Sequence, residues 1–253
     1  MDPTKRFSDR VQDYIRYRPE YPAKVVAYLT KKKILLPGDL VADLGSGTGK
    51  STKIFLEKGF ETYGIEPNEA MRQAAEDLLN SYPNFRSIKG TAEQTNLPDH
   101  SVQLAVAGQA FHWFDIPKAR KEIQRILKPN GYGLLLYNIR ADEASAFMLA
   151  YHQFLLDYST DYRLINKRKV NPEAYQAFFG HENYESTQFP NRQIFDLEGV
   201  KGRYFSCSYA LPESHSNYRE ALKKLNVLFD QHQKNGEIEM IYRTELYWGR
   251  LQD

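Results

Sequence analysis

Three alternating glycines follow a short apolar run, and this stretch has the residue types and spacing best suited to binding a ligand. It reads Asp43-Leu44-Gly45-Ser46-Gly47-Thr48-Gly49-Lys50-Ser51-Thr52. Glycine accepts positive φ angles and lets a ligand approach the backbone with no Cβ in the way. An ordinary turn from a strand into a helix needs only one glycine. The sequence therefore predicts a ligand-binding loop between a buried strand and a helix.

Two nucleotide-binding motifs share part of this pattern. The dinucleotide motif is G-x-G-x-x-G, but Lys50 stands where its third glycine belongs. The P-loop motif, G-x-x-x-x-G-K-[ST], matches Gly49-Lys50-Ser51, but Leu44 stands at its first glycine. A P-loop nucleotidase also needs a carboxylate for Mg²⁺ at a strand end, and the strands expected at 102–107 and 132–138 supply none. A P-loop-like nucleotide-binding protein stays open as an alternative.

The loop resembles motif I of the class I S-adenosylmethionine-dependent methyltransferases, which is an acidic residue followed by x-Gly-x-Gly-x-Gly. Asp43, Gly45, Gly47 and Gly49 match that motif position for position. The resemblance implies that S-adenosyl-L-methionine is the cofactor, with its methionyl tail along the glycines. Asp43 would accept a hydrogen bond from the cofactor ammonium, directly or through water. Lys50 would then be a lysine on a helix surface.

Later segments resemble the same family in the expected order, at 64–68, 90–99, 108–114 and 127–132. Glu66 and Pro67 end the expected second strand, where a carboxylate can accept hydrogen bonds from both ribose hydroxyls. In the family, the position of Ala92 and Glu93 contacts adenine. The resemblance also places Gln109 at the cofactor.

Three segments, 14–22, 110–114 and 242–250, resemble the trans-aconitate methyltransferase-like (methyltransferase type 11) branch. That branch includes carboxyl O-methyltransferases of small molecules. The resemblance implies methylation of a small molecule, with a carboxylate oxygen as a candidate acceptor. Tyr14 and Arg18 are expected at the cofactor, where Arg18 could bind a carboxylate of the cofactor tail or of the substrate.

Methyl transfer is an in-line displacement at a sulfonium, so positioning supplies much of the catalysis. Phe111, Trp113 and Arg140 are expected to bind the substrate, although the two aromatic residues could equally be core. A carboxylate acceptor is already ionised at pH 7 and needs no base. A phenol, enol or amine could need one, and His112 is the candidate, either as base or as a residue that orients the substrate. The histidines and acids lack ligand-like spacing, so no metal site is expected.

The positioning elements alternate regularly along the first half of the chain. Strands are expected at 40–44, 61–65, 85–88, 102–107 and 132–138, and helices at 22–33, 48–58, 68–79 and 117–127. Further helices are expected at 146–158, 172–180, 197–206 and 214–233, and strands at 192–197 and 237–249. The pattern predicts an α/β fold with a parallel sheet covered by helices on both faces. The resemblance implies the rest: a seven-stranded, mostly parallel sheet with an antiparallel last strand, which is a Rossmann-like methyltransferase fold.

The 253 residues are expected to form a single methyltransferase domain. Its parts would be an N-terminal lid (1–22), a cofactor-binding core (23–140), a helical cap insertion (141–190) and C-terminal strands and helix (191–253). The cap would shape the substrate pocket.

Charge and cysteine content narrow the function classes. The net charge is only +2, so a small-molecule acceptor is expected and nucleic acid is an unlikely partner, although a methyltransferase acting on nucleic acid remains an alternative. Cys207 is the one cysteine, and no signal peptide or 18-residue apolar run occurs, which indicates a cytoplasmic protein without a membrane span. Either a monomer or a homodimer is expected.

Overall fold

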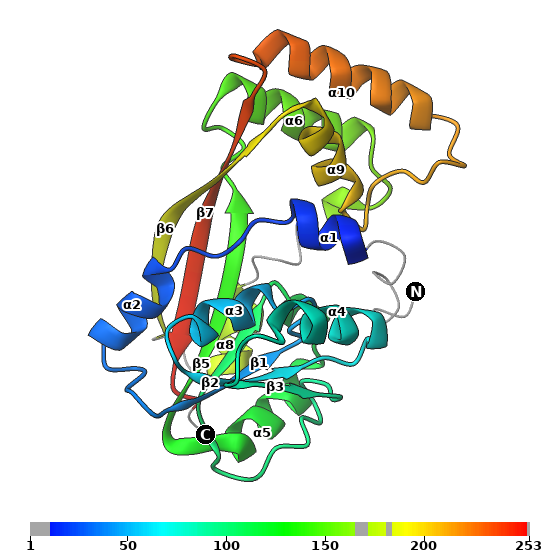
Figure 1. The fold of residues 1–253 in the computed structure, drawn as a ribbon. Helices are drawn as coiled ribbons and strands as arrows, with labels where there is room; N and C mark the ends of the chain where they lie inside the picture. Colours follow the sequence, from blue (N-terminus) through cyan, green and yellow to red (C-terminus); the bar gives the residue numbers. More distant parts are fainter. Residues whose placement is uncertain (1–10, 165–171, 181–183, 252–253) are drawn as a thin grey trace.

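The apolar runs between residues 40 and 138 form the parallel part of a central sheet. The computed structural model describes residues 11–164, 172–180 and 184–251. The strands are β1 (Leu40–Leu44), β2 (Glu61–Ile65), β3 (Phe85–Ile88), β4 (Val102–Gly108), β5 (Leu127–Arg140), β6 (Glu185–Phe195) and β7 (Ile238–Gly249). Their order is β3-β2-β1-β4-β5-β7-β6, with β7 antiparallel to both of its neighbours (Figure 1). The predicted fold class is confirmed.

Helices cover both faces of this sheet, because residues alternate between the two faces along each strand. On one face, α2 (Lys24–Lys31) and α3 (Lys50–Leu56) bury their apolar side chains against residues such as Leu134 and Leu136 of β5. On the other face, α5 (Ile116–Ile126) and α8 (Pro172–Phe179) pack with Leu135 and Tyr137. A further helix, α4 (Glu69–Leu79), follows β2 and is capped by Asn68, whose side chain accepts a hydrogen bond from the Met71 amide at 3.0 Å.

A separate helical group sits at one end of the long strands. It consists of α6 (Ala146–Asp157), α9 (Leu197–Phe205) and α10 (Tyr218–His232), which share a buried apolar cluster with β7. Figure 1 shows this group above the parallel part of the sheet, joined to it by β5, β6 and β7. The expected cap segment 141–190 is therefore divided, because α6 joins α9 and α10 while α8 packs on α5.

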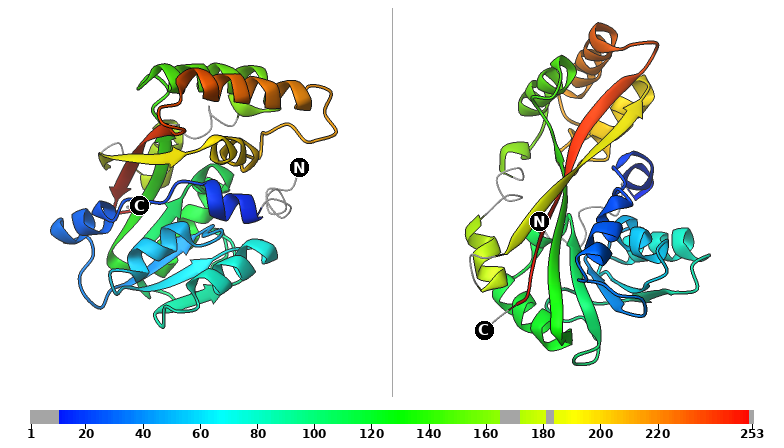
Figure 2. Two further views of the ribbon diagram at one scale, coloured as in Figure 1. Left: turned by 45° about the horizontal axis from the view of Figure 1, so that its top comes forward. Right: turned by 90° about the vertical axis from the view of Figure 1, so that its left-hand side faces the viewer.

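The largest differences from the sequence predictions concern two strands and one helix. The strand expected at 132–138 extends over Leu127–Arg140, and its pairing with β4 is irregular between Leu127 and Tyr132. The strand expected at 192–197 begins at Glu185, because β6 pairs with the whole length of β7. The N-terminal segment contains a helix that was not predicted, α1 (Val11–Tyr17), which packs against α9 and α4. The views in Figure 2 show α1 between the parallel layer and the helical group.

Within the described ranges of the chain, no helix has the length and apolar character needed to cross a membrane.

Candidate active site

The glycine loop is tied to the end of the neighbouring strand. The amides of Gly45 and Ser46 donate to the carbonyl oxygen of Ile65 at 2.8 and 3.1 Å. Gly45 has a φ of 65°, and a Cβ added there would lie 2.8 Å from the Cβ of Ala110. Gly47 has a φ of 58°, with no atom near its open side. The loop therefore needs glycine at both positions, for space at the first and for backbone conformation at both.

Glu66 closes the loop from the next strand. Its carboxylate accepts hydrogen bonds from the Gly47 and Asn68 amides, each at 2.8 Å. Burial raises the pKa of Glu66, and these two amide hydrogen bonds act against that rise. Each carboxylate oxygen has more than one lone pair, so both can still accept a hydroxyl from a ligand.

Asp43 lies beneath the loop and is completely buried. Its Oδ2 accepts hydrogen bonds from the hydroxyls of Ser51 and Thr52, both at 2.7 Å. Among the described residues, its Oδ1 has no hydrogen-bond partner. Burial raises the pKa of Asp43 to about 6, and the two hydroxyls limit the rise. A cationic ligand group above the loop would stabilise the charged form.

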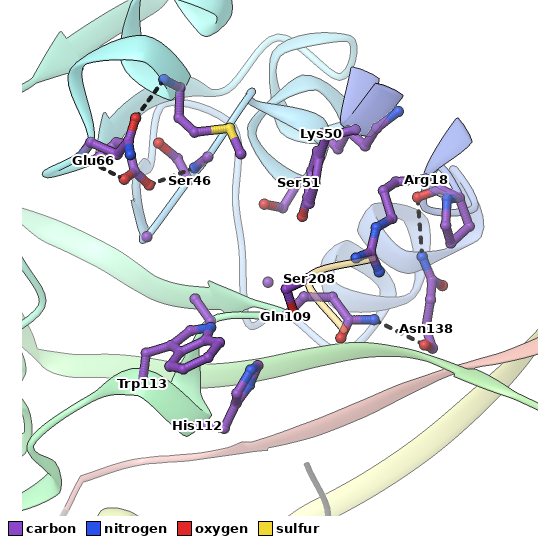
Figure 3. A pocket seen from close by; sticks show the side chains of 18 of the residues that line it. Arg18, Ser46, Lys50, Ser51, Glu66, Gln109, His112, Trp113, Asn138 and Ser208 are labelled. Carbon is purple, nitrogen blue, oxygen red and sulfur yellow. Dashed lines mark hydrogen bonds between the residues drawn. The ribbon is translucent and has the colours of Figure 1, made fainter. Parts of the chain in front are cut away.

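A cavity of about 280 Å³ opens in front of this loop (Figure 3). It lies at the carboxyl ends of the parallel strands, the usual ligand site of such sheets. Most of the predicted site residues line it together: Tyr14, Arg18, Gly45, Gly47, Glu66, Pro67, Ala92, Glu93, Gln109, His112, Trp113 and Arg140.

Three predicted site residues do not line the cavity. Asp43 is below the loop, and Gly49, with a φ of 84°, is the N-cap of α3, facing Leu79. Phe111 is buried in the core, where its ring centroid is 5.0 Å from that of Phe178. The substrate-binding role expected for Phe111 does not fit this position, because apolar packing on the second sheet face withdraws the ring from the cavity.

The segment after β4 forms the floor of the cavity. Gln109 has a φ of 57°, an unusual conformation for a non-glycine residue that is common at functional sites. Its side-chain amide donates to the carbonyl oxygen of Asn138 at 2.9 Å, which fixes the turn against β5. His112 and Trp113 follow in a short 3₁₀ helix (Phe111–Trp113), with their ring centroids 4.7 Å apart.

Arg140, at the end of β5, lines the side of the cavity away from Glu66. Its Nε donates to Asp142 at 2.9 Å, and its Nη2 donates to the hydroxyl of Tyr162 at 2.5 Å. Asp142 is in turn 2.9 Å from Nδ1 of His152. The guanidinium is thus held in one orientation at the cavity wall.

Two further arginines approach the same side. Arg203 of α9 is buried and donates to the hydroxyl of Tyr242 and to the sulfur of Cys207, both at 3.0 Å. Arg18, which follows α1, donates through Nη2 to the carbonyl oxygen of Ser206 at 3.0 Å. Figure 3 shows Arg18 and Ser208 on the side of the cavity opposite Glu66. The cavity therefore has a glycine-loop half and an arginine-rich half.

Sequence reasoning found Arg18 and Arg140 of the arginine-rich half and missed the rest of it. Arg203, Ser208 and Tyr209 line the cavity, but they carry no motif and come from a segment expected to complete the sheet. Lys50 was expected on an open helix surface; it lines the cavity, and its ammonium is 2.5 Å from the carboxylate of Glu20. A P-loop lysine would face a phosphate, so this pairing does not favour the nucleotide-binding alternative.

A family model and two related proteins all indicate the same family for this chain. Residues 42–135 match the family model described as a methyltransferase domain. A methyltransferase of Mycobacterium tuberculosis is 35% identical over 198 residues, which are 78% of this chain and 76% of that protein. A methyltransferase-like protein of Schizosaccharomyces pombe is 29% identical over 246 residues, 95% of this chain and 93% of that protein.

The fold is also shared with a solved enzyme structure. Geranyl diphosphate C-methyltransferase from Streptomyces coelicolor, crystallised with S-adenosyl-L-homocysteine, has a TM-score of 0.50 with this chain at 13% identity. The similarity covers 90% of this chain and 77% of that one.

Proposed function

Because this chain belongs to the S-adenosylmethionine-dependent methyltransferases, we propose that it transfers the cofactor's methyl group to a carboxylate oxygen of a small molecule. The observation that carries the choice of acceptor is the convergence of Arg18, Arg140 and Arg203 on one half of the cavity. Those side chains are permanently cationic, so they favour an anionic acceptor.

We propose that the other half of the cavity holds the cofactor. Gly45 and Gly47 leave room for the methionyl tail, and the carboxylate of Glu66 accepts the ribose hydroxyls. Ala92 and Glu93 would lie at the adenine. Asp43 would act on the cofactor ammonium through water or the loop, because its own carboxylate lies outside the cavity lining.

The arginine-rich half places the neighbouring Cys207 thiol in a positive potential. Burial alone would raise the pKa of Cys207, but Arg18 and Arg203 lower it to about 6. Among the described residues that line the cavity, the carboxylates are Glu66, Glu93 and Asp142. Asp142 and the Cys207 thiolate stand beside these three arginines, so the positive charge is still incompletely balanced without a ligand. A buried cation favours a paired anion.

The reaction needs little from the protein beyond positioning. A carboxylate oxygen attacks the methyl carbon, the bond from carbon to sulfonium sulfur breaks, and S-adenosylhomocysteine and a methyl ester result. No proton has to be removed from the acceptor. We therefore propose that His112 orients the acceptor beside Trp113 instead of acting as a base.

The proposal is tested by ligand binding followed by turnover. S-adenosylmethionine and S-adenosylhomocysteine, at about 100 times their Kd, are expected to raise the unfolding midpoint by roughly 5–10 °C, whereas ATP with Mg²⁺ is not. A panel of small mono- and polycarboxylates is then screened by mass spectrometry for methyl esters, with the matching carboxamides as controls. Methylation of carboxamides, phenols or amines in preference to carboxylates would contradict the proposed acceptor.

The same assay separates the two roles of His112. If His112 orients the acceptor, the rate at which His112→Ala methylates a carboxylate should not depend on pH between about 6 and 8. A loss that high pH restores would indicate a base.

Arg140→Gln is expected to raise the KM for a carboxylate acceptor by roughly 10- to 100-fold, because one charged hydrogen-bond donor is lost. Its Kd for S-adenosylhomocysteine should stay unchanged. Arg192→Gln is the control, since Arg192 is an exposed residue of β6 that pairs with Glu239 outside the cavity lining. Steady-state kinetics and calorimetric titration measure both effects. Equal KM values for the two variants would remove Arg140 from the acceptor site.

A further inference from the structure

The segment after α1 closes the cavity as a strap (residues 18–21), and amide side chains hold its backbone from the strand side. Nδ2 of Asn138 lies 3.4 and 3.3 Å from the carbonyl oxygens of Pro19 and Glu20. Asn191 donates to the same Glu20 oxygen at 2.8 Å. Oδ1 of Asn138 accepts from Thr244 at 2.6 Å, so this anchor is part of a network across β5, β6 and β7.

On the glycine-loop side, the strap is held by charge. The carboxylate of Glu20 lies 2.5 Å from the ammonium of Lys50, the first residue of α3. The Lys50 side chain is 13% exposed and that of Glu20 is 58% exposed. The strap therefore has a neutral, networked anchor on one side and an ion pair open to solvent on the other.

The position of Lys50 in its helix supports this role. A cation in the first turn of a helix is unfavourable, because the amide ends there carry partial positive charge. The first turn of α3 contains no acidic residue of its own. Glu20 supplies the missing negative charge from the strap, so the pair offsets the unfavourable placement of Lys50 while joining the two segments.

We propose that the Lys50–Glu20 ion pair is a latch that slows release of the adenosyl ligand. The ligand half of the cavity lies between the glycine loop and the strap, and separating the strap from α3 opens it. The amide network then acts as the hinge, and the ion pair is the contact that breaks. This inference rests on cofactor binding in the proposed half of the cavity, and it is independent of the acceptor.

The test is the dissociation rate of S-adenosylhomocysteine, followed by stopped-flow fluorescence of Trp113, which lines the cavity. Glu20→Gln and Lys50→Met are each expected to raise this rate about two- to fivefold, the effect of losing one partly exposed ion pair. The double variant should release the ligand no faster than either single one. High salt should speed release from the native protein and leave Glu20→Gln unaffected.

Lys53→Met is the matched control. Lys53 lies on the same helix and pairs with Glu57 at 3.8 Å, outside the cavity lining. The Lys53→Met variant should leave the dissociation rate of S-adenosylhomocysteine unchanged. The charge-exchanged variant, Glu20→Lys with Lys50→Glu, should recover slow release. Unchanged rates in the single variants, or effects that multiply in the double variant, would overturn the latch alone. Absence of any S-adenosylhomocysteine binding would overturn both the latch and the proposed function.

Discussion

Replacing Gly47 by valine is expected to weaken binding of S-adenosylmethionine and S-adenosylhomocysteine by at least about tenfold. A β-branched residue at a φ of 58° carries roughly 1–3 kcal/mol of backbone strain, which the loop can relieve only by changing shape. That change would also move the Gly47 amide, which donates to Glu66. The added side chain would enter the cavity that Gly47 lines. Isothermal titration with S-adenosylhomocysteine measures the loss.

Gly59→Val separates this effect from general destabilisation. Gly59 also has a positive φ, 82°, with no atom within 4 Å of an added Cβ, but it lies outside the cavity lining. Both variants should lower the unfolding midpoint, and only Gly47→Val should lose ligand affinity. Equal affinity in the two variants would show that the glycine loop does not hold the cofactor.

Replacing Asp43 by asparagine is expected to change how stability depends on pH. The pKa of Asp43 is raised to about 6 in the folded protein, against an ordinary value of 3.8. Between pH 4 and 6 the unfolded chain releases this proton while the folded protein keeps it, so the free energy of unfolding falls as pH rises. The full difference between the folded and unfolded pKa values corresponds to about 3 kcal/mol of unfolding free energy.

Asparagine removes this titration. The free energy of unfolding of Asp43→Asn, minus that of the native protein, should therefore rise by about 2–3 kcal/mol between pH 4 and 7. Any constant cost of the new amide cancels in this comparison. Urea unfolding without ligand, at several pH values, measures it. A difference that does not vary with pH would contradict the assignment. The variant should also bind S-adenosylmethionine more weakly, because the charge facing the loop is gone.

The glycine-loop half of the cavity could be predicted from the sequence because its determinants are local. Asp43 lies near the end of β1, Gly45 and Gly47 follow that strand, and Glu66 follows β2, so parallel pairing alone brings them to one edge. Alternation of apolar runs with helical segments was likewise enough to predict the sheet.

The arginine-rich half depends on contacts between distant parts of the chain. Arg18 reaches Ser206 across 188 positions, and Arg203 reaches Tyr242 across 39. Those contacts follow from the docking of α1 on α9 and of α9 near β7, which no local pattern encodes. Phe111 was placed in the site because its neighbours belong there. A 3₁₀ turn points adjacent side chains in different directions, and only packing decides which one is buried.

In the proposed function, β5 would also set a fixed distance that limits the length of the acceptor. Asn138 and Arg140 are two positions apart on this strand, so they share a face and are separated by about 7 Å of nearly inextensible backbone. Asn138 holds the strap, and Arg140 lines the cavity, where we propose that its guanidinium binds the acceptor. Neither can shift along the strand without the other. A molecule whose anionic group rests on Arg140 must therefore fit a fixed interval beneath the strap, and length becomes a criterion of selection alongside charge.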